Sequence, residues 1–176
     1  MKKSCLPNVF TFINLACGII SLLFTFEKNY LVAAIFIIIA GLVDRYDGRI
    51  ARFLQVSSEL GKELDSLADL VSFGVAPSVL VYTIFNFHDL GPLGIIGYIL
   101  VVTYPICGAF RLARFNVSSF DGVFTGVPIT IAGAIMAVFA LLTFRSADIV
   151  MVKGLAIVFL LAFSYLMVSN FRLKKL

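Results

Sequence analysis

The chain has 176 residues, of which 61% are hydrophobic and 14% are charged. Soluble globular domains contain about 45–50% apolar and about 25% charged residues, so this composition excludes a water-soluble domain and a disordered chain. The net charge of +4 does not indicate nucleic-acid binding, because the basic residues are scattered between apolar runs. Such scattering is typical of the loops of membrane proteins. We therefore expect a protein that is embedded in a membrane.

Six apolar segments follow one another along the chain, each bounded by turn residues or by charges. Each is long enough to cross a hydrocarbon layer of about 30 Å at about 1.5 Å per helical residue. We found no internal repeat and no linker. The sequence thus predicts an all-α integral membrane protein with a single domain, residues 1–176, and six transmembrane helices. The expected helices cover residues 7–26, 30–52, 61–85, 93–115, 126–144 and 149–171.

The distribution of basic residues predicts the orientation of these helices. With six spans, both termini lie on the same side of the membrane. Eleven of the 14 lysines and arginines fall on that side. Because loops that carry more Lys and Arg stay in the cytoplasm, we expect a multi-pass protein of the cytoplasmic membrane with both termini cytoplasmic.

The charged residues gather in one short segment, residues 44–69, which holds ten of the 24 charged side chains. Within it, Asp44 and Asp47 are three residues apart, and Asp65 and Asp69 are four apart. At 3.6 residues per turn, each pair lies on one face of a helix. The two helices are joined by a short connection, so we expect them to be neighbours and the four carboxylates to converge.

Four converging carboxylates repel one another unless a cation lies between them. A site made only of carboxylates favours a hard divalent ion such as Mg²⁺, Mn²⁺ or Ca²⁺. The alternative is an ordinary solvated loop held by ion pairs, and it is favoured for Glu59 and Glu63. Paired helical register makes that alternative much weaker for the four aspartates.

Small and basic residues accompany the aspartates. Gly48 and Ala51 follow the first pair by one turn, and Gly61 precedes the second pair by one turn. Small side chains leave room for a bulky ligand beside the acidic faces. Arg49 and Arg52 add positive charge that suits phosphate. Together these residues predict metal-assisted chemistry on a diphosphate.

The segment from Asp44 to Asp69 fits the pattern D-x2-D-G-x2-A-R-x8-G-x3-D-x3-D at all eight fixed positions. This pattern resembles the signature of the CDP-alcohol phosphatidyltransferase family. Four flanking segments resemble the small, membrane-integral phosphatidylserine synthases of that family, so that the resemblance spans nearly the whole chain. They are LPNVFTFINLACG (6–18), LDSLADLVSFGVAPS (64–78), GAFRLARFN (108–116) and FTGVPI (124–129).

The resemblance implies roles for these residues. The four aspartates would bind one or two Mg²⁺ or Mn²⁺ ions, and Asp69 would also act as the general base. Six residues would contact the CDP group or make room for it: Asp44, Gly48, Ala51, Arg52, Gly61 and Asp65. The family commonly forms homodimers, so membrane lipids and a second copy of the chain are expected partners.

The implied reaction converts CDP-diacylglycerol, or an ether-lipid equivalent, and L-serine into phosphatidylserine and CMP. A serine hydroxyl is a poor nucleophile and needs a positioned base. The nearest alternative is a sibling enzyme that uses glycerol 3-phosphate or inositol phosphate as the acceptor. A divalent-cation transporter is a more distant alternative, because its acidic residues should be spread through the depth of the membrane.

Three further residues have two interpretations each. Arg111 and Arg114 lie three residues apart near the cytoplasmic end of the fourth expected helix. They either anchor the helix to lipid head groups or bind the serine carboxylate or a substrate phosphate. Asn14, midway along the first helix, makes either an interhelical hydrogen bond or a contact with the nucleotide or metal site.

Overall fold

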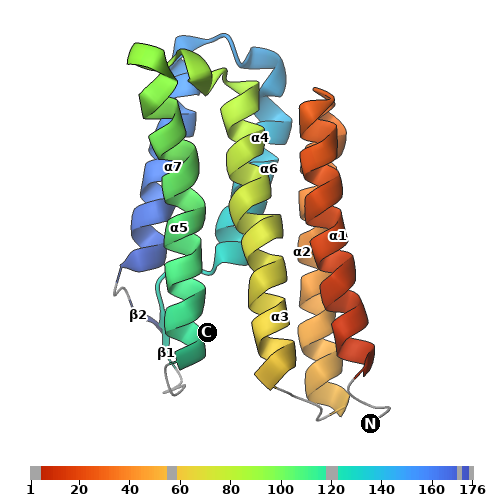
Figure 1. Ribbon diagram of the computed structural model, residues 1–176. Coiled ribbons are helices and arrows are strands. Elements are labelled where there is room, and N and C mark those ends of the chain that lie inside the picture. The colour runs from red at the N-terminus through yellow and green to blue at the C-terminus, as the bar shows by residue number, and fades with distance from the viewer. Residues whose placement is uncertain (1–4, 55–58, 118–122, 170–171, 175–176) are drawn as a thin grey trace.

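The computed structural model describes residues 5–54, 59–117, 123–169 and 172–174, and the side chains of residues 9–46, 59–117 and 126–169 among them. Long helices stand side by side in a bundle (Figure 1). The helical elements are α1 (Cys5–Phe26), α2 (Tyr30–Leu54), α3 (Glu59–Asp69), the π-helical segment η1 (Leu70–Val75), α4 (Ala76–Ile84), the 3₁₀ turns η2 (Phe87–Asp89) and η3 (Pro92–Gly94), α5 (Ile95–Val117), α6 (Ile129–Thr143), the 3₁₀ turn η4 (Phe144–Ser146) and α7 (Val150–Val168).

The protein is an all-α, multi-pass membrane protein. Within the described residues, five helical stretches are long and apolar enough to cross a membrane: Val9–Phe26, Glu59–Ile84, Pro92–Val117, Ile129–Ser146 and Val150–Val168. Helix α2 is also long, with 25 residues, but its second half carries the charged residues. Large apolar side chains such as Ile99, Leu142 and Val150 are exposed on the outside of the bundle, where lipid would cover them. The six expected helical segments are therefore all present.

The third expected helix differs from a regular α-helix in its middle. Helices α3 and α4 are joined end to end by η1, in which the Ala76 N–H donates to the Val71 carbonyl, five residues back. Pro77 follows directly and has no N–H to donate, so the α-helical ladder cannot run uninterrupted through this point. The π-helical turn begins at the residue after Asp69.

The fifth expected helix begins later than the apolar pattern indicates. Gly126 has φ +75°, and a Cβ at this position would lie 2.7 Å from the Met167 carbonyl oxygen. Pro128 is the N-cap of α6, which starts at Ile129. Residues 126–128 therefore form a turn that lies against the end of α7, and the prediction of a helix from residue 126 is wrong for this turn.

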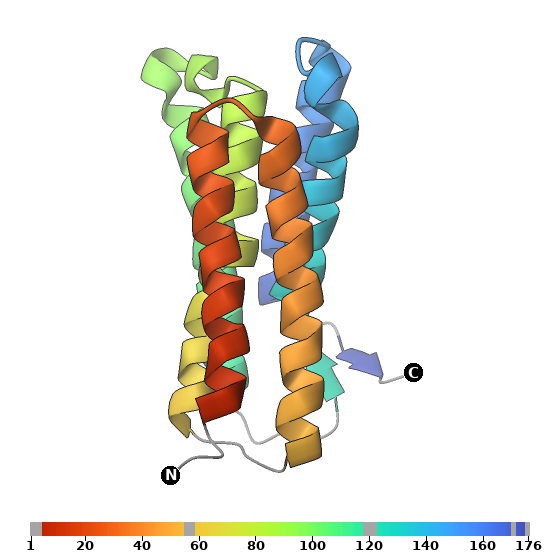
Figure 2. The same ribbon diagram turned by 90° about the vertical axis from the view of Figure 1, so that its right-hand side faces the viewer.

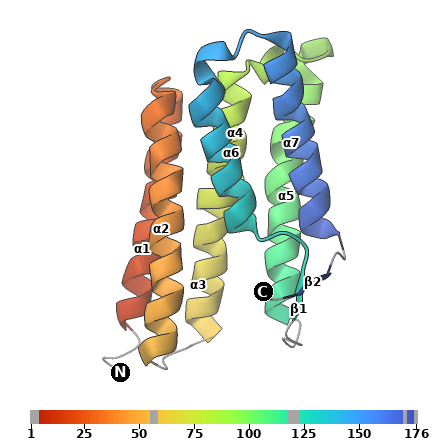
Figure 3. The same cartoon turned by 180° about the vertical axis from the view of Figure 1, so that it is seen from behind.

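Packing places η1 at the centre of the bundle. Helices α1 and α2 form an antiparallel pair (Figure 2), α6 packs beside α2 near the middle of the bundle, and α7 packs along α5 on the far side (Figure 3). Phe73 of η1 is fully buried. A Cβ on Gly133 of α6 would lie 2.7 Å from the Phe73 Cα, so these two backbones approach closely. A small residue such as Gly133 at a helix interface permits this close approach, from which membrane helices gain packing energy.

One end of the bundle collects the elements that carry the predicted site. Helices α1 and α3 begin there and α2 and α5 end there, while α6 begins further along the bundle with its first turn directed towards this end (Figures 1 and 3). The two short strands, β1 (Val123–Thr125) and β2 (Arg172–Lys174), pair antiparallel at this end, with Val123 opposite Lys174 and Thr125 opposite Arg172. The predicted aspartates and arginines thus belong to one end of the fold.

Candidate active site

Three of the predicted carboxylates come together. Asp44 of α2 and Asp65 and Asp69 of α3 each offer one carboxylate oxygen, and these oxygens all lie within 4.8 Å of one another. Asp69 is buried, with 7% of its surface exposed, while Asp44 and Asp65 are half-buried. The spacing of four residues places Asp65 and Asp69 on one face of α3, as predicted. The side chain of Asp47 lies outside the described residues.

This cluster fits a hard divalent cation. Its donors are all carboxylate oxygens, which are the ligands that Mg²⁺, Mn²⁺ and Ca²⁺ prefer. Softer metals prefer sulfur or imidazole ligands instead. Three negative charges this close repel one another strongly where water is partly excluded. A cation bound among the three carboxylates would reduce this repulsion. The three side chains already face the same space, so each could offer an oxygen to the ion.

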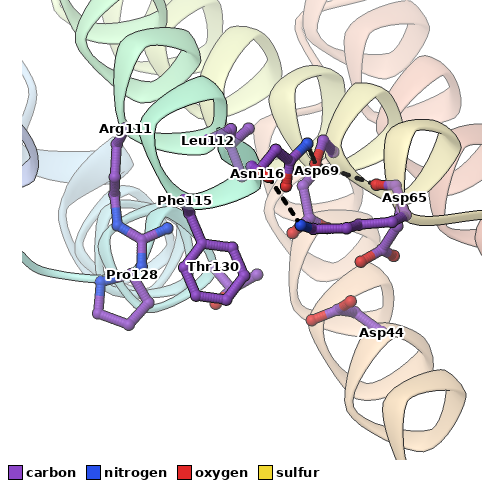
Figure 4. Close-up of a pocket in the computed structure, with 11 residues that line it drawn as sticks. Asp44, Asp65, Asp69, Arg111, Leu112, Phe115, Asn116, Pro128 and Thr130 are labelled. Carbon is purple, nitrogen blue, oxygen red and sulfur yellow. Dashed lines mark hydrogen bonds between the residues drawn. The ribbon is translucent and has the colours of Figure 1, made fainter. Parts of the chain in front are cut away.

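A cavity of about 230 Å³ opens beside the cluster. Figure 4 shows the carboxylates on one side of it and Arg111 with Pro128 on the other. The cavity therefore has an acidic wall and a wall that carries a guanidinium group. Its lining residues are Asp44, Lys62, Asp65, Ser66, Asp69, Arg111, Leu112, Phe115, Asn116, Pro128 and Thr130.

Arg111 is a cavity residue. It comes from α5, and only 7% of its surface is exposed. Its Nε is buried and has no hydrogen-bond partner among the described residues. A buried donor without a partner is costly, and a guanidinium group prefers the planar, two-point geometry of a carboxylate or phosphate. This arrangement suits an anionic group bound in the cavity.

Arg114 serves a different part of the structure. Its Nη1 donates to the Val168 carbonyl at 3.0 Å, and its Nη2 donates to the carbonyls of Met167 and Ser169 at 3.3 and 3.4 Å. These are the last carbonyls of α7, which have no partners within the helix and attract positive charge. Arg114 is not among the residues that line the cavity. The two arginines therefore face different surroundings although they lie three residues apart.

Asn14 of α1 forms a hydrogen bond with the acidic cluster. Its side-chain Nδ2 donates to Asp69 Oδ1 at 3.0 Å, from α1 to α3. The interhelical hydrogen bond that is one of the two interpretations of Asn14 is thus present, and its partner is a residue of the acidic cluster. Asn14 is not a lining residue of the cavity.

The predicted CDP contacts lie along the same helices. Gly61 is half-buried in α3, one turn before Asp65. Gly48, Ala51 and Arg52 belong to the last part of α2. Their side-chain surroundings lie outside the described residues, and their contact with CDP stays a prediction.

Several polar residues of the cavity were not predicted. Asn116, at the end of α5, donates through Nδ2 to Ser66 Oγ at 2.9 Å and to Glu63 Oε1 at 3.2 Å. Its backbone carbonyl accepts a hydrogen bond from Lys62 Nζ at 3.0 Å. Asn116 therefore ties the start of α3 to the end of α5. Lys62 and Ser66 share a helix face with Asp65 and Asp69, so helical spacing could have found them. Asn116 of α5 and Thr130 of α6 line the cavity because of tertiary packing, which the spacing of residues does not predict.

A comparison with protein families identifies the chain. The family model of the CDP-alcohol phosphatidyltransferases matches residues 4–166. The chain belongs to the CDP-alcohol phosphatidyltransferase family. This confirms the resemblance that the eight-residue signature carries, and it makes the chain an enzyme of that family. The family is generally dependent on a divalent metal, and the three described carboxylates are residues that could hold one.

Curated relatives within the family agree with one another. The chain is 37% identical over 168 residues to the CDP-diacylglycerol–serine O-phosphatidyltransferase of Bacillus subtilis (strain 168), covering 95% of this chain and 88% of that protein. It is 33% identical over 173 residues to the enzyme of the same name from Helicobacter pylori (strain ATCC 700392 / 26695), covering 94% and 70%. It is also 34% identical over 170 residues to the archaetidylserine synthase of Methanothermobacter thermautotrophicus, covering 94% and 67%.

Proposed function

We propose that this family member transfers the phosphatidyl group of CDP-diacylglycerol to L-serine, giving phosphatidylserine and CMP. The observation that carries the proposal is the cavity whose acidic wall faces Arg111 (Figure 4). The acidic wall suits a metal-bound diphosphate, and the buried guanidinium group suits the carboxylate that distinguishes serine from a simple alcohol. The names of the relatives, which include serine phosphatidyltransferases from two bacteria, support this choice of acceptor.

Asp44, Asp65 and Asp69 would hold the divalent cation, together with Asp47 as the signature predicts. Mg²⁺ and Mn²⁺ suit such a set of oxygen donors, and the site would take one or two ions. When bound, the cation neutralises negative charge on the diphosphate and on the departing CMP.

Asp69 is proposed as the general base. Its carboxylate lines the cavity and is held in place by Asn14. It would take the proton of the serine hydroxyl as the serine oxygen forms a bond to the phosphorus that carries the diacylglycerol. The bond from that phosphorus to the bridging oxygen breaks, and CMP leaves with the electron pair. Arg111 would hold the serine carboxylate on the opposite wall and so orient the hydroxyl.

The position of the cavity supports a reaction at the membrane boundary. Its lining includes Phe115 and Asn116 in the last turn of α5, and α5 and α2 end at the same end of the bundle (Figure 1). The acyl chains can therefore remain in lipid while the nucleotide and serine arrive from water. The excess of Lys and Arg on that side favours the cytoplasmic face of the cell membrane. Gly48, Ala51, Arg52 and Gly61 would contact or accommodate the CDP group. A homodimer is part of the same proposal and rests on the family resemblance.

The acceptor can be tested directly. The purified protein in detergent is incubated with CDP-diacylglycerol and Mn²⁺, and with serine, glycerol 3-phosphate or inositol phosphate in separate reactions. CMP release and the lipid product are measured. We expect turnover with serine, loss of turnover with a chelator and recovery when Mn²⁺ or Mg²⁺ is restored. Turnover with glycerol 3-phosphate but not with serine would overturn the proposal.

Arg111 provides a second test. Arg111→Lys keeps the charge but loses the two-point geometry, so we expect the KM for serine to rise by about 10-fold or more, since hydrogen bonds to charged groups contribute about 1.5–3 kcal/mol. The KM for CDP-diacylglycerol should stay unchanged. Arg114→Lys is the matched control, because Arg114 binds the end of α7 instead of the cavity. An unchanged KM for serine in the Arg111 variant would remove it from the acceptor site.

A further inference from the structure

We infer that Asn14 is a positioning residue for Asp69: its side-chain amide holds one oxygen of the Asp69 carboxylate, so that the carboxylate presents its other oxygen to the cavity. Asn14 is 1% exposed and does not line the cavity, so it acts through Asp69 and does not touch substrate. The inference depends on the proposed function only in giving Asp69 the role of general base.

The hydrogen bond has a defined direction. Nδ2 of Asn14 lies 3.0 Å from Oδ1 of Asp69. An ionised carboxylate only accepts hydrogen bonds, so the amide must turn its NH₂ group towards it. A hydrogen bond to a charged acceptor is stronger and more strongly oriented than one between neutral groups. The bond therefore restricts the rotation of the Asp69 side chain.

The backbone of Asn14 is held as firmly as its side chain. Ser72 Oγ donates to the Asn14 carbonyl at 2.8 Å, which joins α1 to η1. One turn further along α1, a Cβ on Gly18 would lie 2.5 Å from Ser72 Oγ and 2.8 Å from Ser72 Cα. Only glycine allows this approach, so α1 and η1 are in close contact beside Asn14. The amide is thereby presented to Asp69 from a rigid support.

Asp69 lies where the continuous helix changes from α-helical to π-helical geometry. Asp69 is the last residue of α3, and the π-helical segment starts at Leu70. A π-helical turn is wider than an α-helical turn and is often found at functional sites. Asp69 itself keeps α-helical backbone angles, φ −60° and ψ −41°. The hydrogen bond from Asn14 therefore restrains this carboxylate from a second helix, at the point where the two helix geometries meet.

The amide is kept at a cost. Oδ1 of Asn14 is buried and has no hydrogen-bond partner among the described residues. An unsatisfied buried acceptor is destabilising, whereas a leucine of similar volume would have no such penalty. A side chain that served only to pack α1 against η1 would not need an amide here. Its presence is accounted for by the bond to Asp69.

The test compares Asn14→Leu and Asn14→Ala with the unchanged protein. Neither variant can donate to Asp69; leucine keeps the volume, and alanine avoids any crowding between α1 and η1. We measure kcat and KM with CDP-diacylglycerol and serine. Separately, without substrate, we measure Mn²⁺ binding by electron paramagnetic resonance. Thr25→Val is the matched control, because Thr25 is a buried polar residue of α1 whose side-chain hydroxyl donates to the Ser21 carbonyl of its own helix.

We expect kcat and Mn²⁺ affinity to fall by about 10–100-fold in both Asn14 variants, as for residues that orient a metal ligand. The KM for CDP-diacylglycerol should not change, and Thr25→Val should behave like the unchanged protein. Unchanged kcat and Mn²⁺ affinity in the Asn14 variants would overturn the inference, as would an equal loss in Thr25→Val. If the unchanged protein did not use serine, the proposed function would fail, while the Mn²⁺ measurement would still decide the role of Asn14.

Discussion

The two ends of the bundle are built on different principles. At one end, polar and charged side chains from α2, α3, α5 and α6 surround a cavity of about 230 Å³. Towards the other end, aromatic rings fill the space between helices. Phe139 lies 5.9 Å from Phe85 and 4.9 Å from Phe159, measured between ring centroids, and Tyr82 stacks on Tyr98 at 5.8 Å. The aromatic end is filled by packed rings, which stabilise the fold. The polar end contains a cavity in place of packed side chains.

The continuous helix of α3, η1 and α4 shows this difference along a single rod. Helix α3 carries Asp65 and Asp69 and is largely polar, while in α4 Leu80, Val81 and Ile84 are buried. The change of geometry falls between them, in η1. The residues that line the cavity and the rings that pack the opposite end are thus different sets. Variants at the two ends should therefore affect different measurements.

The largest effect is expected from Asp69→Asn. The variant removes the proposed base and a carboxylate of the acidic cluster, so we expect kcat to fall by about 10²–10⁴-fold. CMP release with serine and CDP-diacylglycerol is the measurement. Asp89→Asn is the control, since Asp89 is an exposed carboxylate at the opposite end of the molecule. Full activity of the Asp69 variant would mean that the polar end does not work as described.

Phe139→Ala should have the converse effect. Phe139 is 8% exposed and packs against the rings of Phe85, the C-cap residue of α4, and Phe159 of α7. Loss of a buried phenylalanine costs about 3–5 kcal/mol of stability, so the midpoint of thermal unfolding in detergent should fall. The kcat of the folded fraction should be unchanged. Phe26→Ala serves as the comparison, because that ring is 68% exposed and its loss leaves no internal cavity. A large loss of kcat with little loss of stability would contradict the separation of the two ends.

The smallest effect is expected from His88→Gln. His88 Nε2 lies 3.1 Å from Asp89 Oδ1, and both side chains are more than half exposed. This contact is an ion pair only when His88 is protonated, and exposed ion pairs contribute about 0–1 kcal/mol and are weakened by salt. We expect no change in activity and a shift in the unfolding midpoint that is small and disappears in high salt. A marked loss of turnover would contradict this prediction, because it would mean that a change in η2 alters the reaction in the cavity.

The sequence by itself determined the local features of this protein. The lengths of the apolar runs predicted the six helical segments, and the charges of residues 44–69 marked the site. The four-residue spacing of Asp65 and Asp69 placed both on one face, because that relation depends only on the helical repeat. The eight-residue signature led to the correct family. The π-helical turn η1, by contrast, was not predicted.

Only the tertiary structure decided which residues meet across helices. Asn14 and Asp69 are 55 residues apart, and Lys62 and Asn116 are 54 apart. No repeat in the sequence relates such pairs, since the rotation of each helix about its axis is set by packing against its neighbours. The same rotation separates Arg111, which faces the cavity, from Arg114, which binds the end of α7. Local periodicity therefore predicted the acidic face, and the packing of α1, α5 and α6 around it decided what that face can do.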